Sequence, residues 1–491
     1  MRRHQKVPSL KQMTAEKAKA DCFRLLPVSS CLKLALRMNT PIGDAIHISR
    51  SAADLNDVEQ RAAKSKITWR LLPLLFFCYI IAYIDRINVG FAKLHLREVL
   101  GVEPGVFSSV YGFGAGLFFI GYFIFEVPSN LILHRVGARV WIARIMIVWG
   151  FVSMAFMFLN SVTMFYVMRF LLGVAEAGFF PGVILYLTYW YPAKDRARTI
   201  ALFTLGGVAA GVIGSPVSGA ILGMGGVAGL AAWQWLFLLE AIPAVLMGIV
   251  IFFILPNNPQ QARWLSDREK AWMQHRMAED AANTSSSQRH SLRDVFTSRH
   301  VWLLCMLYFL LNVGGYGYEM WLPTIVKGFS GQSDHMVGLI NIIPYFVAGV
   351  VMILVGQYAD RSGERRKCVA VAAISAAIGF GLAAYFKNPY LAMAALTLAF
   401  AGIKSTIGPF WAIGTAFLSG TAAAGGIAVI NSVGNLGGFF GPTIVGLIKD
   451  RTGSDVAAML LLGGALLSMG LLAFAMPNST SKPTRSETGS K

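Results

Sequence analysis

The sequence predicts an all-α membrane protein in which twelve transmembrane helices form two six-helix halves around a central cavity. Three observations lead to this fold class. Of the 491 residues, 55% are hydrophobic and only 14% are charged. Twelve apolar runs are long enough to span a bilayer, which takes about 20 residues, and lipid favours the helix for runs of this kind. A polar stretch after the sixth run divides the chain into comparable halves.

The expected helices are the apolar runs themselves, taken in chain order. In the first half they cover residues 69–92, 106–131, 139–159, 163–190, 197–222 and 233–255. In the second half they cover residues 300–322, 335–358, 367–386, 389–416, 421–448 and 456–476. The 50 glycines of the chain suit close helix–helix packing in lipid.

The other segments are expected outside the membrane. We predict a disordered cytoplasmic tail at 1–66, a first half at 67–255, a cytoplasmic loop at 256–299, a second half at 300–476 and a cytoplasmic tail at 477–491. The first tail has mixed charge and lacks the apolar core and cleavage site of a signal peptide. Within the central loop, the charged run Leu265–Asp280 predicts a short surface helix.

Lysine and arginine are distributed unevenly between the two sides of the predicted bundle. With both termini in the cytoplasm, the cytoplasmic segments hold 33 of these residues and the opposite loops hold 6. Positive residues concentrate on the cytoplasmic side of membrane proteins, so we expect a multi-pass protein of the cell inner membrane with both termini inside. The net charge of +18 then faces the anionic inner leaflet and requires no nucleic acid.

One loop recurs in the two halves. The loop after the second span reads His-Arg-Val-Gly-Ala-Arg at His134–Arg139, and the loop after the eighth reads Asp-Arg-Ser-Gly-Glu-Arg-Arg at Asp360–Arg366. A basic, glycine-containing turn at matching places implies an internal duplication. Two six-helix halves around a central cavity are typical of membrane transporters.

Four of the charged residues inside the predicted spans form two acid–base pairs. Arg169 and Glu176 are seven residues apart in the fourth span, about two helical turns, so both face the same way about 10 Å apart. Asp85 and Arg86 lie late in the first span. A charge at bilayer depth costs at least about 2.5–3.5 kcal/mol. Two embedded acid–base pairs therefore indicate a path for a charged solute and a proton.

The two embedded acids have a structural and a functional interpretation. Asp85 and Glu176 either neutralise Arg86 and Arg169 in fixed ion pairs or take up and release protons. Burial favours a neutral carboxyl and a neighbouring arginine favours an ionised one, so these opposed influences allow a change of charge. An anion arriving beside Arg169 would compete with Glu176 for that cation and would therefore favour protonated Glu176. The arginines do not titrate, and their planar fork suits a carboxylate.

Further polar residues in the spans keep more than one interpretation. Glu126, Glu240 and Glu319 are expected in structural hydrogen bonds or gates. Asn431 and Asn435 are four residues apart and share a helix face, which suits either helix–helix hydrogen bonding or a binding site.

Aromatic residues and one lysine in the second half are also ambiguous. Tyr316, Tyr318 and Trp321 are expected either at the membrane interface or in the cavity wall. Lys404 lies near mid-depth of the tenth span. It would pair with a carboxylate, extend to an aqueous cavity or contact a substrate, because an isolated cation there is unstable.

No feature of the sequence predicts a metal centre or a cofactor. The five cysteines show no paired spacing, so free thiols are expected, and all eight histidines fall in tails, loops or helix ends. A membrane-embedded enzyme would need a nucleophile–base or metal constellation that the spans lack, so we do not expect an enzyme. A sensor derived from a transporter is disfavoured by the embedded charges and by a central loop without a sensory domain.

The chain resembles the major facilitator superfamily. Residues Gly356–Arg366 match its gating-loop motif, whereas the first copy has His134 where an acid is common. More narrowly, the chain is similar to the anion:cation symporter family, in its bacterial organic-acid branch. The motifs that carry this resemblance, which extends over about 69–476, are Tyr83–Asn88, Glu126–Asn130, Gly137–Trp141, Gly173–Gly182, Tyr189–Pro192 and Ile430–Pro442.

The resemblance implies a proton-coupled symporter that imports a small organic anion by alternating access. Relatives in this branch take up tartrate, phthalate, hydroxyphenylacetate or sugar acids; an efflux antiporter or an uncoupled facilitator is the alternative. We expect a monomer in the lipid bilayer. The resemblance assigns proton coupling to Asp85 and Glu176, anion binding to Arg86 and Arg169, and a polar contact to Asn431. To these we add Lys404 and Tyr316 as substrate contacts and Asp360, Arg361 and Arg365 as an inner gate.

The charge asymmetry predicts which loops reagents can reach. In a background without the native cysteines, Gly331→Cys should react with a membrane-impermeant thiol reagent applied to intact cells, because residue 331 lies in a predicted outer loop. Ser285→Cys, in the predicted cytoplasmic loop, should react only after the cells are permeabilised. Labelling of residue 285 in intact cells would contradict the predicted orientation.

Overall fold

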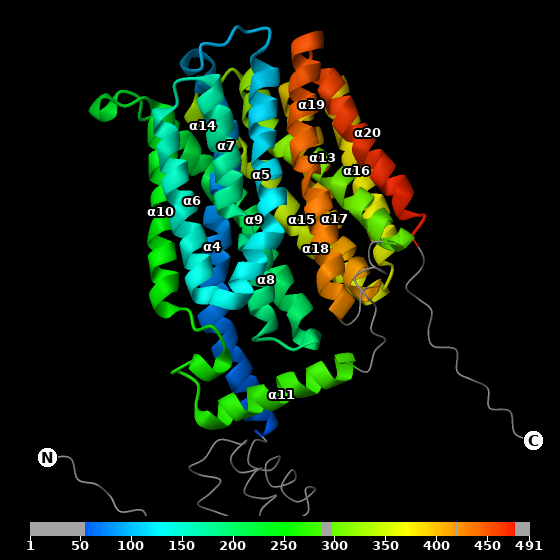
Figure 1. Cartoon of the computed structure of the whole chain (residues 1–491). Helices are drawn as coiled ribbons and strands as arrows, with labels where there is room; N and C mark the ends of the chain where they lie inside the picture. The colour runs from blue at the N-terminus through cyan, green and yellow to red at the C-terminus, as the bar shows by residue number, and fades with distance from the viewer. Residues whose placement is uncertain (1–54, 286–296, 418–420, 477–491) are drawn as a thin grey trace, which may run out of the picture. The chain divides into compact units, whose positions relative to one another are not determined.

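The computed structural model describes residues 55–285, 297–417 and 421–476 (Figure 1). These residues fall into two compact units. The larger unit contains residues 66–262 and 277–476, and therefore both predicted halves of the bundle. The smaller unit contains residues 55–65 and 263–276.

The helices of the first half follow the predicted spans. They are α4 (Asp57–Val99), α5 (Phe107–Val136), α6 (Ala138–Ala155) with the 3₁₀ turn η1 (Phe156–Phe158), α7 (Val162–Glu176), α8 (Phe179–Thr188), α9 (Ala193–Leu222), η2 (Val227–Gly229) and α10 (Ala232–Ile254). The central loop contributes η3 (Pro259–Gln261) and α11 (Asp267–Ser285). The helix expected at Leu265–Asp280 is present as α11.

The second half is helical in the same way. Its elements are α13 (Arg299–Ser330), α14 (Asp334–Ile340), α15 (Ile342–Ser362), α16 (Arg365–Tyr385), α17 (Pro389–Phe417), α18 (Thr421–Asn435), α19 (Gly437–Thr452) and α20 (Asp455–Ala473). Three predicted spans are each divided into two helices: α7 with α8, α14 with α15, and α18 with α19.

The predicted fold class agrees with this architecture. In the described part of the chain, eleven helices are long and apolar enough to cross a membrane. The remaining predicted span, 421–448, consists of α18 and α19, which have 15 and 16 residues and meet at Leu436. Together the two helices cover the predicted run, so the described residues are all-α and include the twelve expected spans.

The prediction of a disordered tail at 1–66 is wrong for residues 57–66, which form the first turns of α4. A reciprocal cap starts this helix. The Asn56 side chain accepts a hydrogen bond from the Glu59 backbone at 2.9 Å, and the Glu59 carboxylate accepts one from the Asn56 backbone at 3.0 Å. Such a cap satisfies amide groups that the first turn leaves unpaired. Residues 1–54 lie outside the described part of the chain.

In the described part of the chain, the two halves meet where α5 packs against α19 and where α9 packs against α14 and α15 (Figure 1). Glycines allow the backbones to approach closely at both places. A Cβ at Gly112 of α5 would lie 2.3 Å from the Pro442 carbonyl oxygen, and one at Gly446 of α19 would lie 2.1 Å from that of Ser108. A Cβ at Gly338 of α14 would lie 2.4 Å from the carbonyl oxygen of Ser215. A side chain at any of these positions would separate the halves.

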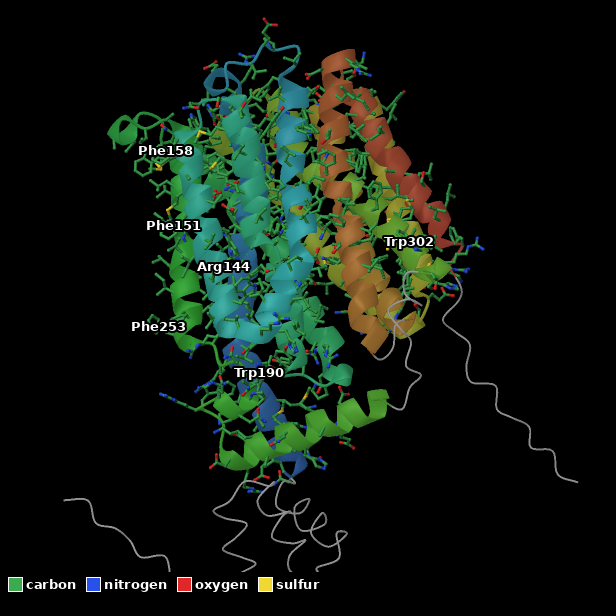
Figure 2. The ribbon with its side chains drawn as sticks, in the orientation of Figure 1. Arg144, Phe151, Phe158, Trp190, Phe253 and Trp302 are labelled. Carbon is green, nitrogen blue, oxygen red and sulfur yellow. The ribbon has the colours of Figure 1, made fainter. Side chains whose placement is uncertain are left out.

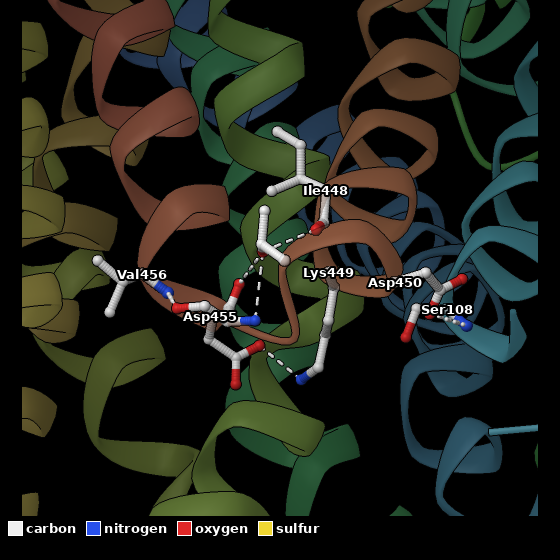
Figure 3. A network of polar contacts seen from close by, with 8 residues as sticks. Ser108, Ile448, Lys449, Asp450, Asp455 and Val456 are labelled. Carbon is white, nitrogen blue, oxygen red and sulfur yellow. Dashed lines mark hydrogen bonds and ion pairs between the residues drawn. The ribbon is translucent and has the colours of Figure 1, made fainter. Parts of the chain in front are cut away.

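The end of the bundle that carries residues 100–106, 331–333 and 453–454, called here the predicted outer end, is closed by polar contacts as well. The Asp450 carboxylate accepts hydrogen bonds from the backbone amides of Ser108 and Ser109 at 3.1 and 2.6 Å. It thus joins the end of α19 to the amino terminus of α5, where a carboxylate is electrostatically favourable. Figure 3 shows Asp450 beside the Lys449–Asp455 ion pair, whose atoms are 2.5 Å apart.

Large apolar side chains cover the side of the bundle formed by α6 and α10, which pack against each other. Phe151, Phe158 and Phe253 are exposed along the edge that α6 and α10 form in Figure 2, and Trp302 of the second half is exposed as well. Arg144 of α6 is also exposed, and its guanidinium lies 4.6 Å from the centre of the Trp141 ring. An apolar surface of this kind suits lipid, with the arginine head extended along the helix.

Close packing of α5 against α7 makes the first half sensitive to one methyl group. Gly173→Ala would place a Cβ 1.9 Å from the Phe118 carbonyl oxygen. Because a backbone atom cannot move aside easily, we expect a loss of about 1–3 kcal/mol and a lower melting temperature of the purified protein in detergent. Gly381→Ala in α16 meets no neighbouring element within 4 Å and should keep or raise the melting temperature. Equal melting temperatures for the two variants would contradict this packing.

Candidate functional site

Glu176 pairs with the arginine of another helix. It is the last residue of α7, it is fully buried, and its carboxylate accepts a hydrogen bond from the Arg86 guanidinium of α4. Arg86 also donates to the Tyr316 hydroxyl of α13 at 3.0 Å. The rings of Phe118 and Tyr122 lie 5.1 and 5.5 Å from the guanidinium carbon. The pair is thus buried in an aromatic environment and reaches the second half through Tyr316.

The sequence after Glu176 explains why its helix ends there. Gly178 has φ of 87°, a left-handed conformation that favours glycine, and separates α7 from α8. A Cβ at this position would also lie 2.2 Å from the Ser129 hydroxyl of α5. The break therefore fixes Glu176 at a helix terminus inside the bundle.

Asp85 lies beside Arg86 in sequence but belongs to a different network. Its carboxylate accepts hydrogen bonds from the Ser153 hydroxyl of α6 and, at 3.5 Å, from the Asn88 side chain. Asn88 also faces Glu240 of α10, which accepts a hydrogen bond from Ser218 at 2.6 Å. Two buried acids of the first half therefore share one chain of neutral polar partners.

Arg169 is buried without a carboxylate partner among the described residues. Its guanidinium donates to the Ala115 carbonyl oxygen at 3.0 Å and lies 5.2 Å from the Phe118 ring. It is 1% exposed. An ionised arginine that donates a hydrogen bond to only one carbonyl oxygen keeps other N–H donors unused. Unused donors are expected of an anion-binding residue.

Lys404 has a carboxylate neighbour. Its ammonium nitrogen lies 2.9 Å from Glu319 Oε1 of α13 and donates a hydrogen bond to the Tyr83 hydroxyl at 2.9 Å. The Tyr83 hydroxyl in turn donates to Glu319 Oε2 at 2.7 Å. Because Tyr83 comes from α4, this cluster of three side chains connects the two halves.

A cavity of about 80 Å³ opens against these groups. Both halves supply its wall, and its polar lining includes four tyrosines. The polar and aromatic lining residues are Tyr79, Tyr83, Phe180, Thr204, Tyr308, Asn312, Tyr316, Glu319, Lys404 and Trp411. Of the predicted substrate contacts, Tyr316 and Lys404 line the cavity, whereas Arg86, Arg169 and Asn431 are not among its lining residues. Tyr318 and Trp321 lie in the protein core.

Asn431 contacts an acid of the other half. Its side-chain amide donates to Glu126 Oε1 of α5 at 2.6 Å, and Ser432 donates to Glu126 Oε2 at 2.9 Å. The buried Glu126 carboxyl thus occupies the donors that an incoming carboxylate would use. Asn431 and the Arg86–Glu176 pair are placed on opposite halves, as a central site requires.

The predicted gating residues lie at the opposite end of the bundle, called here the predicted inner end. Asp360 and Arg361 are exposed at the end of α15, and Arg365 begins α16. Arg365 lies 3.9 Å from Asp360 and donates to the Ala412 carbonyl oxygen at 3.3 Å. The contacts recorded for these residues in the described part of the chain remain within the second half.

Sequence reasoning missed several residues. The predicted first span, 69–92, leaves Lys93 outside the helix, but α4 continues to Val99 and Lys93 is only 5% exposed, against the ring of Trp321. Tyr79 and Tyr83 line the cavity, and their four-residue spacing in an apolar helix was an available signal. The role of Glu319 as the neighbour of Lys404 could not be read from sequence because 85 residues separate them.

The arrangement is suited to binding anions and holding protons. The bundle contains three buried cations of the predicted site, Arg86, Arg169 and Lys404, together with buried acids, and phenolic hydroxyls contact Arg86 and Lys404. Among the described residues, no group of three or more histidine, cysteine, aspartate or glutamate side chains is placed to hold a metal ion.

Comparison with known proteins agrees with the fold described above. The chain matches the profile of the Major Facilitator Superfamily over residues 75–442. It is 46% identical over 437 residues to a protein of Agrobacterium vitis provisionally named a tartrate transporter, covering 89% of this chain and 96% of that protein. It is 40% identical over 401 residues to the quinolone resistance transporter of Acinetobacter baumannii, covering 82% and 92%. The xylose transporter XylE from E. coli, in a partially occluded inward open conformation, has a similar fold: TM-score 0.69, 16% identity, coverage 84% and 99%.

The Lys404–Glu319 pair predicts a defined pattern of stability. Removing one partner of a buried ion pair costs about 3–5 kcal/mol, whereas removing both is much less harmful. We therefore expect Lys404→Met and Glu319→Gln each to lower the melting temperature of the purified protein, and the double variant to recover part of the loss.

The exposed pair of Lys367 and Glu364, 2.6 Å apart, provides the control. Because surface pairs contribute about 0–1 kcal/mol, Lys367→Met should change the melting temperature little. If the double variant melts no higher than the less stable of the two single variants, Lys404 and Glu319 do not compensate each other's charge.

Proposed function

The chain belongs to the Major Facilitator Superfamily, and from this premise we propose that it is a proton-coupled symporter that imports a small organic anion by alternating access. The substrate would be a carboxylate: a dicarboxylate, an aromatic acid or a sugar acid. It would work as a monomer in the cell inner membrane, with both termini cytoplasmic. The name of the Agrobacterium vitis relative favours an organic acid.

The observation that carries the proposal is the buried contact between Glu176 and Arg86, with Tyr316 of the other half as its neighbour. An arginine keeps its charge, whereas a carboxyl can be neutralised by a proton. A substrate carboxylate that binds the Arg86 fork competes with Glu176 for the same donors. Protonation of Glu176 then removes the repulsion between two anions, so proton and anion bind together.

Asp85 and Arg169 complete the proposed machinery. Arg169 has unused donors and no carboxylate partner among the described residues, so it is available to the anion. Asp85 is held by a hydroxyl and an amide, which serve either charge state of the carboxyl. We propose that Asp85 is the second proton-coupling acid and that Asn431 contacts the substrate once Glu126 releases it.

The two ends of the bundle support alternating access. At the predicted outer end, backbone contacts at Gly446 and the Asp450 cap join the halves. At the predicted inner end, Asp360 and Arg365 contact only their own half within the described residues. We propose that this conformation is closed to the outside and that Asp360, Arg361 and Arg365 close the inner end when the halves rock.

A second candidate function is efflux by proton antiport. It is favoured by the 40% identity to the quinolone resistance transporter. The two functions differ in the gradient that drives accumulation: a symporter concentrates substrate on the side toward which protons flow, and an antiporter concentrates it on the opposite side. An uncoupled facilitator would concentrate it on neither side.

Glu176→Gln should separate coupling from substrate passage. In right-side-out membrane vesicles, the wild-type protein should concentrate an organic anion under an inward proton gradient and lose the accumulation when a protonophore is added. The variant cannot bind or release the coupling proton, so we expect it to lose accumulation under the gradient but to keep exchange of labelled for unlabelled substrate.

Glu240→Gln is the matched control, because Glu240 is a buried acid of the same half. Its partner, the Ser218 hydroxyl, can also form a hydrogen bond with the amide of a glutamine. It should accumulate substrate as the wild type does. Normal gradient-driven accumulation by Glu176→Gln would exclude Glu176 as the coupling acid. Accumulation under an outward proton gradient would favour efflux.

A further inference from the structure

Glu319 stands in the place where a second substrate carboxylate would bind. We propose that a dicarboxylate substrate displaces Glu319 from Lys404 and that the displaced Glu319 takes up a proton. The number of protons bound would then follow the number of carboxylates on the substrate. This inference rests on the proposed function, because it extends the same coupling of anions to protons to a second buried acid.

The geometry permits such an exchange. Lys404 and Glu319 both line the cavity, so a ligand there reaches the ammonium group without crossing another layer of side chains. The ammonium nitrogen has Glu319 Oε1 and the Tyr83 hydroxyl within 2.9 Å. A ligand carboxylate could replace Oε1 and leave the contact between Tyr83 and Glu319 Oε2 in place.

A carboxylate that displaces Glu176 or Glu319 from its cation leaves that acid buried without its partner. Without ligand, Arg86 lies against Glu176 and Lys404 against Glu319, so each of these cations has one acid. A monocarboxylate adds one negative charge, which protonation of Glu176 offsets. A dicarboxylate adds a second, and buried charge without a partner is strongly unfavourable. Protonation of Glu319 offsets the second charge.

Within the described part of the chain, Lys404 is the only cation recorded in an ion pair with Glu319. The titratable groups that face it from neighbouring helices are Lys404 of α17, Tyr79 and Tyr83 of α4, and Tyr345 of α15, and from its own helix Tyr316 and Tyr318. Phenolic hydroxyls donate hydrogen bonds but carry no positive charge. Once an anion takes Lys404, the neutral acid is therefore the favoured form of Glu319.

The test measures protons taken up on binding, without a membrane or a gradient. Purified protein in weakly buffered detergent, near neutral pH, is mixed with tartrate, succinate or phthalate, and a pH indicator reports the protons bound. Thermal stabilisation identifies which probes bind. Each is compared with a monocarboxylate of similar skeleton: 2,3-dihydroxybutanoate, butyrate or benzoate. The wild-type protein should bind one proton more with a dicarboxylate than with its monocarboxylate partner.

Two variants assign the extra proton. Glu319→Gln should remove the difference between dicarboxylate and monocarboxylate, whereas Glu240→Gln should keep it. Lys404→Gln should weaken binding of the dicarboxylate by about 10–100-fold, the range expected for a lost hydrogen bond to a charged group, and that of the monocarboxylate far less.

The outcomes separate this inference from the proposed function. Equal proton uptake with both probe classes in the wild-type protein, or an extra proton that persists in Glu319→Gln, would overturn it, and neither result concerns Glu176. Failure of all three dicarboxylates to stabilise the protein would overturn it too. Loss of symport in vesicles with an intact extra proton in detergent would overturn the proposed function only. The wild-type comparison needs no variant, so poor folding of Glu319→Gln does not remove the test.

Discussion

The cost of holding a charge away from water determines how the centre of this protein is built. Arg86 and Lys404 each have a carboxylate in contact, and each pair takes its members from two different helices. Isolated in lipid or in an apolar core, any of these groups would destabilise the fold by several kcal/mol. Because each cation depends on an acid, an arriving anion changes the balance of the whole site. The same constraint thus accounts for stability without ligand and for response to a ligand.

Glycine determines how near the two halves can approach at the predicted outer end. At Gly112, Gly446 and Gly338, the helices of opposite halves are so close that no side chain fits between them. Such contacts are short-range, so a small rotation of one half against the other would lose them together. They can therefore close one end of a cavity firmly and still release it in one step, which a network of strong ion pairs would make harder.

The sequence predicted the fold well and the site in part. Length, hydropathy and charge asymmetry are properties of single segments, so the spans, the helix α11 and the buried positions of Asp85, Arg86, Arg169 and Glu176 could be inferred. Partners could not, because they depend on how helices pack. Sequence spacing suggested Arg169 as the neighbour of Glu176, whereas the structure gives it Arg86, 90 residues away. Composition also failed to predict the start of α4, because this helix begins at the Asn56 cap, inside the expected tail.

Two tyrosines connect the charge of the site to the positions of the halves. Tyr316 of the second half accepts a hydrogen bond from Arg86 of the first, and Tyr83 of the first half contacts both Glu319 and Lys404 of the second. A change in the charge of either acid alters a contact that crosses the boundary between the halves. A ligand can shift a conformational equilibrium only by the difference between its interaction free energies with the two conformations. These crossing contacts supply such a difference, so in the proposed mechanism anion, proton and movement are linked through the same few side chains.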